Sequence, residues 1–387
     1  MKTSEKKEVK EKVKKEDSQK VKNIKFHILA IFCIIIFCAS ICPVTMQNDT
    51  YYTIKIGEHI INTKTVDMQD PFSWHELPYT YPHWAYDVMI YLIYNLGGFL
   101  GIFISTIVFA CILGILMYCT NYKISKNKLI SFAITIGGMF LIKDYIAARA
   151  QLVTFILLEL TILLIENFLE KKKVGYAIGI IVISTAIANL HCAVWPFFFV
   201  IFLPYIAEYL IFTVIDAQPV YRIRKKYYDV KIKNYNKKIE KEAIEENKKI
   251  LDEKLKKVIT AKEKFEEKNA KILKNREAKR KEPYKIRYNK NKNAKWLILI
   301  MAICVLTGLL TPLGDTTKSI SEHLPLTLIN NKEMLVVLTA TLALLIFTDT
   351  KIRLKDLFMF AGLTLLMFMT RRQESMLVLL GSAVLAT

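Results

Sequence analysis

Acidic, imidazole and guanidinium side chains gather in five polar stretches of a sequence that is otherwise rich in apolar residues. The first stretch, residues 47–95, is the longest and carries six Asp or Glu residues. The four others are short, and their candidates for phosphate or acceptor binding are Lys143, Arg149, His191, Glu322, His323, Arg371 and Arg372. A carboxylate can remove a proton from a hydroxyl or amine, while Arg and His can neutralise a leaving phosphate. Together these residue types predict group transfer from a lipid-phosphate donor.

Aromatic residues of the first stretch could bind the transferred group. Trp74 and Trp84 offer flat amphipathic faces that suit sugar rings. The same residues also suit the aromatic belt at a membrane–water interface, so both interpretations stay open. His83, Glu322 and His323 are further candidates for contact with the sugar or the acceptor.

Long apolar stretches separate the polar ones and must position them. They cover residues 26–46, 100–119, 129–142, 152–168, 174–188, 197–214, 296–313, 334–348 and 357–369. A spanning helix needs about 20 residues, so the shorter stretches must include flanking residues. Backbone amides in hydrocarbon must be satisfied within their own segment, which leaves helices and predicts an all-α fold. The sequence thus predicts a polytopic membrane protein with about ten crossing helices.

The last apolar stretch, residues 375–387, is too short to cross a bilayer at about 1.5 Å per residue. Either it re-enters the membrane or the chain is truncated inside a helix at Thr387, and we favour truncation.

Basic residues occupy alternate loops, which predicts the orientation of the chain. The N-terminal tail, residues 1–25, carries ten Lys against five acidic residues. Further Lys or Arg residues of the same set of loops lie at 123–128, 171–173, 216–295 and 351–355. The positive-inside rule assigns this set to the cytoplasm and the five polar stretches to the outer face. We expect the first apolar stretch to be an uncleaved N-terminal anchor in the plasma membrane. The usage of Lys, Ile and Asn is typical of an AT-rich genome, so we expect the organism to be a bacterium.

The longest cytoplasmic stretch is a basic insert with 28 Lys or Arg against 12 acidic residues between Ala217 and Lys295. It has neither Gly nor Pro between Pro219 and Pro283, which predicts a long helix or a loose hairpin. One apolar heptad position, occupied by Phe265 among others, indicates at most a marginal coiled coil. The composition favours a solvated spacer, and docking to anionic lipid or to a protein partner is the alternative. No recognition motif supports nucleic-acid binding.

These features divide the chain into a basic tail (1–25), a transmembrane module (26–215) that contains the first outer loop (47–95), a cytoplasmic helical insert (216–295) and further transmembrane helices (296–387).

The order of several short motifs resembles that of a known enzyme family. The motifs are Asp49, Gly57-Glu58-His59-Ile60-Ile61, Asp70-Pro71-Phe72-Ser73, Trp84, the amphipathic stretch 86–94, Gly97-Gly98, Arg149-Ala150-Gln151 and Asn189-Leu190-His191. The sequence is similar here to polytopic GT-C glycosyltransferases, in particular bacterial dolichyl-phosphate-mannose-protein-mannosyltransferase-like enzymes that use polyprenyl-phosphate sugars. The resemblance covers residues 26 to about 215 and implies a GT-C-like helical bundle.

The resemblance also implies roles for single residues. A catalytic carboxylate just after the first span corresponds to Asp49, with Asp70 as the second choice of base; Asp70 also suits a turn before Pro71. Arg149 and His191 correspond to phosphate or acceptor binding; Lys143, Arg371 and Arg372 are donor-binding candidates by residue type alone. Some relatives use a divalent cation such as Mg²⁺ or Mn²⁺, which Asp49, Asp70 and His191 could bind, and the metal stays undetermined.

Two other classes of function compete with transfer. Glu159 lies near the middle of one apolar stretch and Glu208 within another, where an ionisable residue is costly and points to a transporter or a flippase. A protonated structural carboxyl is the alternative for Glu159. A non-catalytic membrane scaffold is the third hypothesis.

Overall fold

The computed structural model describes residues 2–69, 78–80, 83–281, 286–287, 291–311, 332–347, 352–369 and 374–386. Six predicted site residues lie outside the described residues: Asp70, Trp74, Glu322, His323, Arg371 and Arg372.

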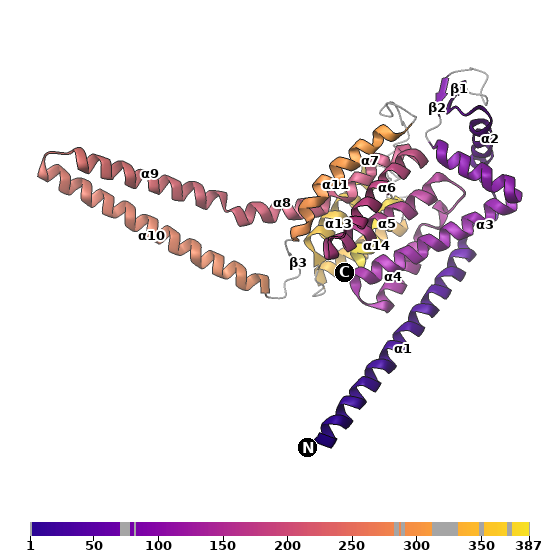
Figure 1. Cartoon of the computed structure of the whole chain (residues 1–387), viewed down its shortest axis with the longest axis horizontal. Helices are drawn as coiled ribbons and strands as arrows, with labels where there is room; N and C mark the ends of the chain where they lie inside the picture. The colour runs from indigo at the N-terminus through magenta and orange to yellow at the C-terminus, as the bar shows by residue number, and fades with distance from the viewer. Residues whose placement is uncertain are drawn as a thin grey trace. The chain divides into compact units, whose positions relative to one another are not determined.

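The described chain is helical almost throughout, as predicted (Figure 1). Its α-helices are α1 (Lys2–Ile41), α2 (Asn48–Thr63), α3 (Trp84–Ser125), α4 (Lys128–Leu141), α5 (Ala150–Lys171), α6 (Val174–Leu190), α7 (Trp195–Phe198), α8 (Leu203–Ala217), α9 (Pro219–Lys241), α10 (Glu245–Lys281), α11 (Lys295–Leu306), α12 (Lys332–Phe347), α13 (Leu354–Met369) and α14 (Glu374–Leu385). Single 3₁₀ turns are η1 (Lys143–Tyr145), η2 (Cys192–Val194), η3 (Phe199–Ile201), η4 (Lys292–Ala294) and η5 (Thr307–Leu310). The strands are β1 (Asp67–Gln69) antiparallel to β2 (Pro78–Thr80), and β3 (Ile286–Arg287) parallel to β4 (Ile352–Arg353).

The chain forms two compact units, which we call the membrane unit and the insert unit. The membrane unit comprises residues 1–206, 291–348 and 355–387, and the insert unit comprises residues 207–290 and 349–354.

Five segments in the described part of the chain are long and apolar enough to cross a membrane. They are residues 23–41, α3, α5, the run 192–241 and the run 292–310. The chain is therefore an all-α membrane protein.

The count differs from the prediction of about ten crossing helices, because several apolar helices end early. Asn127 caps α4 by accepting hydrogen bonds from the amides of Leu129 and Ile130, so this helix has 14 residues. At 1.5 Å per residue α4 is about 21 Å long, against about 30 Å of hydrocarbon. Helix α6, with 17 residues, and the C-terminal helix α14, with 12, are also shorter than about 20 residues.

Within the membrane unit, the helices pack in sequence order around α3 and α5. Helix α1 contacts α3 and α4, α3 contacts α5, α5 contacts α6, and α6 contacts α11. The C-terminal helix α14 contacts α3, α4 and α5, and its residues 375–384 are all buried. The predicted final apolar stretch thus forms part of the core of this unit.

Helix α3 bends at Gly98, whose φ of 60° and ψ of −150° are not helical. A conformation with positive φ favours glycine, because a Cβ atom would meet the backbone there. Residues 84–97 form the first segment of α3, and α2 packs against α3 beside it (Figure 1). The break lies at the Gly97-Gly98 pair that closes the predicted amphipathic stretch.

Polar contacts join the helix ends of the membrane unit in two separate groups. At the end that carries α2, which we call the α2 end, the contacts are Asp49–Arg149, Trp84–Asn189 and Asn189–Leu310. At the opposite end they are Asn23–Lys128, Lys123–Glu170, Leu169–Asn291, Glu166–Tyr205 and Glu166–Lys355. The first group joins residues in or next to predicted outer loops, and the second joins residues in or next to predicted cytoplasmic loops, or within the apolar stretches beside them.

The insert unit is built on an antiparallel pair of helices, α9 and α10 (Figure 1). The ring of Phe265, from the apolar heptad position, stacks on Tyr221 at 5.5 Å and contacts Tyr228 at 5.9 Å. Ion pairs join Lys262 to Asp229 at 2.7 Å and Lys225 to Glu266 at 3.1 Å. The hairpin alternative of the prediction is therefore the observed one.

Candidate functional site

Asp49 and Arg149 meet at the α2 end although they lie 100 residues apart in sequence. Asp49 is in the first turn of α2, where the helix dipole favours a negative charge, and Arg149 is the N-cap residue of α5. The guanidinium Nη2 of Arg149 donates to Oδ2 of Asp49. Both side chains are partly exposed, 44% for Arg149 and 42% for Asp49. The structure thus unites the predicted base and a predicted phosphate ligand in one accessible ion pair.

A second pair, between His83 and Asp87, lies at the start of α3. Nδ1 of His83 is 2.7 Å from Oδ1 of Asp87. The Asp87 side chain is 0% exposed, and its Oδ2 has no hydrogen-bond partner. One proton between Nδ1 and Oδ1 satisfies both atoms, and the donor depends on the tautomer of His83. The buried acid holds the imidazole ring of His83 in a fixed orientation at the start of α3.

Tyr86 connects the two pairs. Its side chain is buried, and its ring packs in an apolar cluster with Ile54 of α2 and Ala150 of α5. Tyr86 directly precedes Asp87 in the sequence, and Ala150 of the same apolar cluster directly follows Arg149. The cluster therefore joins the three helix starts that carry the two pairs.

Close packing between α2 and α3 depends on Gly57, the first residue of the motif Gly57-Glu58-His59-Ile60-Ile61. A Cβ atom on Gly57 would lie 2.6 Å from Cβ of Tyr91, and the carbonyl oxygen of Asp87 would be nearer still. The neighbouring motif residues Glu58 and His59 form contacts within α2, to Lys55 at 2.8 Å and to Thr63 at 3.3 Å. The exposed ion pair with Glu58 raises the pKa of Lys55. Gly57 thus sets how closely α2 approaches the His83–Asp87 pair.

Trp84 fixes the first segment of α3 to helix α6. Its indole Nε1 donates to Oδ1 of Asn189 at 3.1 Å. The side-chain nitrogen Nδ2 of Asn189 donates to the backbone carbonyl oxygen of Leu310 at 3.2 Å. These two hydrogen bonds hold Trp84 against α6 through its ring nitrogen, and its role as a sugar platform stays a prediction.

His191 and Lys143 lie apart from the exposed pair. His191 is buried, with Nδ1 3.0 Å from the hydroxyl of Thr154. That hydroxyl gives its proton to the carbonyl of Ala150, so the imidazole is the donor. Lys143 lies in η1, with its ammonium over the ring of Phe140 at 4.5 Å. The structure brings together Asp49 and Arg149, and it places His191 in the interior.

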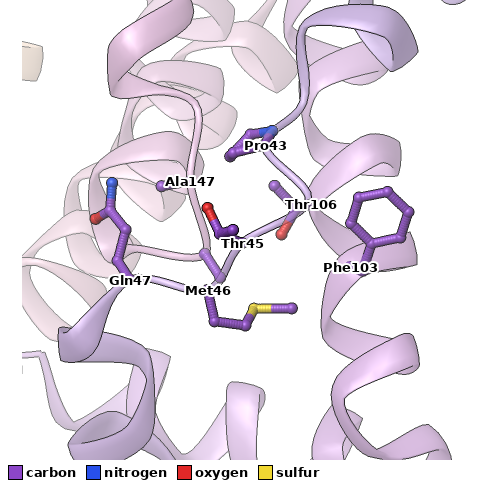
Figure 2. Close-up of a pocket in the computed structure, with 8 residues that line it drawn as sticks. Pro43, Thr45, Met46, Gln47, Phe103, Thr106 and Ala147 are labelled. Atoms are coloured by element: carbon purple, nitrogen blue, oxygen red, sulfur yellow. The ribbon is translucent and has the colours of Figure 1, made fainter.

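A small hollow lies between the segment 43–47 that precedes α2, helix α3 and the segment 147–148 that precedes α5 (Figure 2). Its walls are Pro43, Thr45, Met46, Gln47, Phe103, Thr106, Ala147 and Ala148. Its volume is about 10 Å³, which is room for one water molecule and far less than a sugar requires. Oε1 of Gln47 is buried without a protein partner.

Among the described residues, no group of three or more His, Cys, Asp or Glu side chains is placed to hold a metal ion. The predicted metal set includes Asp70, which lies outside those residues.

Glu159 is buried in the interior of α5. Its side chain is 0% exposed and faces Thr120 of α3, and both carboxyl oxygens lack a hydrogen-bond partner. Thr120 differs from several other helical threonines in its hydrogen bonding. Other threonine hydroxyls bond to the backbone carbonyl four residues earlier, among them those of Thr106, Thr135, Thr154, Thr161, Thr185, Thr213, Thr260 and Thr341. The Thr120 hydroxyl has no such bond. Glu208 of α8 is also buried.

Sequence reasoning assigned no specific role to Asp87. The feature of the sequence that could have identified Asp87 is its spacing of four residues from His83, which places both side chains on one face at the start of a helix.

Comparison of the chain with protein-family models, with curated proteins and with solved structures finds no match.

Proposed function

We propose that this protein is a multi-pass membrane glycosyltransferase of the bacterial plasma membrane, with its N-terminus in the cytoplasm. It transfers a sugar from a polyprenyl-phosphate donor to an acceptor at the α2 end. The observation that supports the proposal is the exposed Asp49–Arg149 pair, which joins a carboxylate that can act as base to a guanidinium that can bind phosphate.

The proposed reaction uses each member of the pair once. Asp49 takes the proton of an acceptor hydroxyl, and the freed oxygen forms a bond to the anomeric carbon of the sugar. The bond between that carbon and the phosphate oxygen breaks, and polyprenyl phosphate leaves with the electron pair. Arg149 neutralises the charge on the leaving phosphate through a charge-assisted hydrogen bond.

The ion pair does not prevent this reaction. Exposed pairs contribute about 0–1 kcal/mol to stability, so Arg149 can turn from Asp49 to a phosphate at little cost. His83 and Trp84 lie at the start of the adjoining α3 and would contact the sugar or acceptor from that side.

A turnover assay on the purified protein tests the proposal. Polyprenyl-phosphate mannose and polyprenyl-phosphate glucose are supplied as labelled donors, and transfer and donor binding are measured separately. General-base catalysis contributes about 10²–10⁴-fold, so Asp49→Asn should lower turnover by that factor with little change in donor binding. Arg149→Ala should weaken donor binding, because it removes the phosphate contact.

Asp144→Asn is the matched control. Asp144 is an exposed carboxylate of η1 at the same end, so the variant makes the same change of charge and should keep normal turnover. Near-normal transfer by Asp49→Asn would reject Asp49 as the base.

Transport is a second candidate function, because Glu159 is a buried carboxyl whose oxygens lack partners. Intramembrane acids of this kind mark ion or proton pathways. If the protein transports, Glu159→Gln should abolish uptake or counterflow of a lipid-linked or small anionic substrate in proteoliposomes. If it is a transferase, Glu159→Gln should leave sugar transfer within about threefold, since Arg149 lies ten residues away along α5, about 15 Å.

A further inference from the structure

Helix α9 carries an apolar stripe that no other described part of the chain covers. The stripe consists of Val220, Ile223, Tyr227 and Val230, at spacings of three and four residues that place them on one face of a helix. These side chains are 72%, 71%, 57% and 50% exposed, in that order. Such a row of exposed large apolar side chains marks an interaction surface.

The opposite face of α9 is already occupied by α10. Tyr221, Lys225 and Tyr228 are half-buried there, against Phe265 and Glu266. The apolar stripe therefore cannot be the seam of the hairpin, and it needs a different partner.

Basic residues border the stripe on both sides. With 3.6 residues per turn, Arg222, Lys226 and Lys233 lie on one side of it and Arg224 and Lys231 on the other. Helix α9 has nine Lys or Arg residues and two acidic ones, and the acid Asp229 is paired with Lys262 of α10. An apolar stripe between two basic rows is complementary to an anionic lipid surface.

The place of α9 in the chain favours a membrane over a soluble partner. Helix α8 is apolar and ends at Ala217, two residues before the start of α9. Gln218 between them has a left-handed backbone, with φ of 46°, which ends one helix and allows the next to take a new direction. Helix α9 thus follows directly on an apolar helix that is part of a candidate membrane-crossing run.

We propose that α9 lies on anionic lipids at the surface reached by α8, with its apolar stripe at the boundary between acyl chains and headgroups. Its Arg and Lys residues contact lipid phosphates, and α10 covers the side of α9 that faces away from the membrane. This surface is independent of the proposed sugar transfer.

Fluorescence quenching by lipid tests the proposal on the full chain. The seven native Cys residues are replaced, and a fluorophore is attached to Ile223→Cys on the stripe or to Thr260→Cys. Thr260 is exposed on α10, on the face opposite the residues that contact α9, and serves as the matched control. Each protein is reconstituted in nanodiscs of phosphatidylcholine alone or mixed with phosphatidylglycerol, all with brominated acyl chains that quench on contact.

We expect quenching at Ile223→Cys to exceed that at Thr260→Cys several-fold in the anionic nanodiscs. Quenching should fall without phosphatidylglycerol or at high salt, which screens charge attraction. Absence of quenching at Ile223→Cys in both lipids would overturn the proposal and point to a soluble partner. Equal quenching in both lipids would overturn the requirement for anionic lipid.

Charge reversal tests the basic rows. The triple variant Arg222→Glu, Lys226→Glu, Lys233→Glu should lower quenching at Ile223→Cys. The control triple Lys256→Glu, Lys257→Glu, Lys264→Glu changes the net charge equally on exposed positions of α10 and should leave it high. An equal loss in both triples would show an effect of net charge alone and would contradict the proposed face.

Discussion

At the scale of single residues, the two pairs at the α2 end differ in burial and therefore in energetics. The Asp49–Arg149 pair is exposed to water and can open at low cost. The side chain of Asp87 is fully buried, so its hydrogen bond to His83 replaces hydrogen bonds to water that were lost on folding. The first pair therefore suits a role in binding and transfer, and the second suits positioning.

Asp87→Asn should destabilise the protein by about 1–3 kcal/mol, because it removes a charged partner from a buried hydrogen bond. Unfolding in detergent, followed by intrinsic fluorescence, measures the change. Glu58→Gln breaks the exposed pair with Lys55 on the neighbouring α2 and should cost less than about 1 kcal/mol. Equal losses in the two variants would contradict the burial argument.

At the scale of elements, the site depends on how closely α2 packs on the first segment of α3. Gly57 faces the carbonyl of Asp87 and Cβ of Tyr91, so the two backbones approach without an intervening side chain. The break at Gly98 then frees this segment to follow α2, while the apolar remainder of α3 packs with α1, α4 and α5.

Gly57→Ala should lower stability by about 1–3 kcal/mol through overpacking, although alanine favours a helix. Gly137→Ala in α4 is the matched control, because a Cβ atom there meets no atom within 4 Å. That variant should be neutral or gain up to about 1 kcal/mol from helix propensity. The same unfolding assay distinguishes them, and a stable Gly57→Ala would contradict the close approach.

At the scale of the whole molecule, the charged loops are divided in the same way as the two groups of polar contacts in the membrane unit. Loops rich in Lys and Arg contact one another at the end opposite α2, and loops rich in potential catalytic groups contact one another at the α2 end. Positive-inside orientation would then place the two groups in different compartments.

Labelling with an impermeant thiol reagent in intact cells tests this orientation. In a Cys-free chain, Thr65→Cys beyond α2 should be labelled from outside, because the α2 end is extracytoplasmic in the proposal. Thr260→Cys in α10 should be labelled only after the membrane is opened. The reverse pattern would place the Asp49–Arg149 pair in the cytoplasm and would remove the basis for transfer to an outer acceptor.

Local properties of the chain made part of this fold and site predictable. Apolar stretches predicted membrane helices, the lack of Gly and Pro in the insert predicted long helices, and Gly97-Gly98 predicted the end of the amphipathic stretch. Each of these depends on propensity or hydropathy summed over neighbouring residues.

The remaining features depend on which helices pack together and in what rotation, and only the tertiary structure decided them. The sequence by itself determined that Asp49 and Arg149 follow apolar stretches, and folding decided that they pair across 100 residues. Folding also decided that His191 turns inward to Thr154 and that Asp87 is buried beside His83. Contacts between distant residues depend on the packing of all the helices at once, and no local pattern specifies that packing.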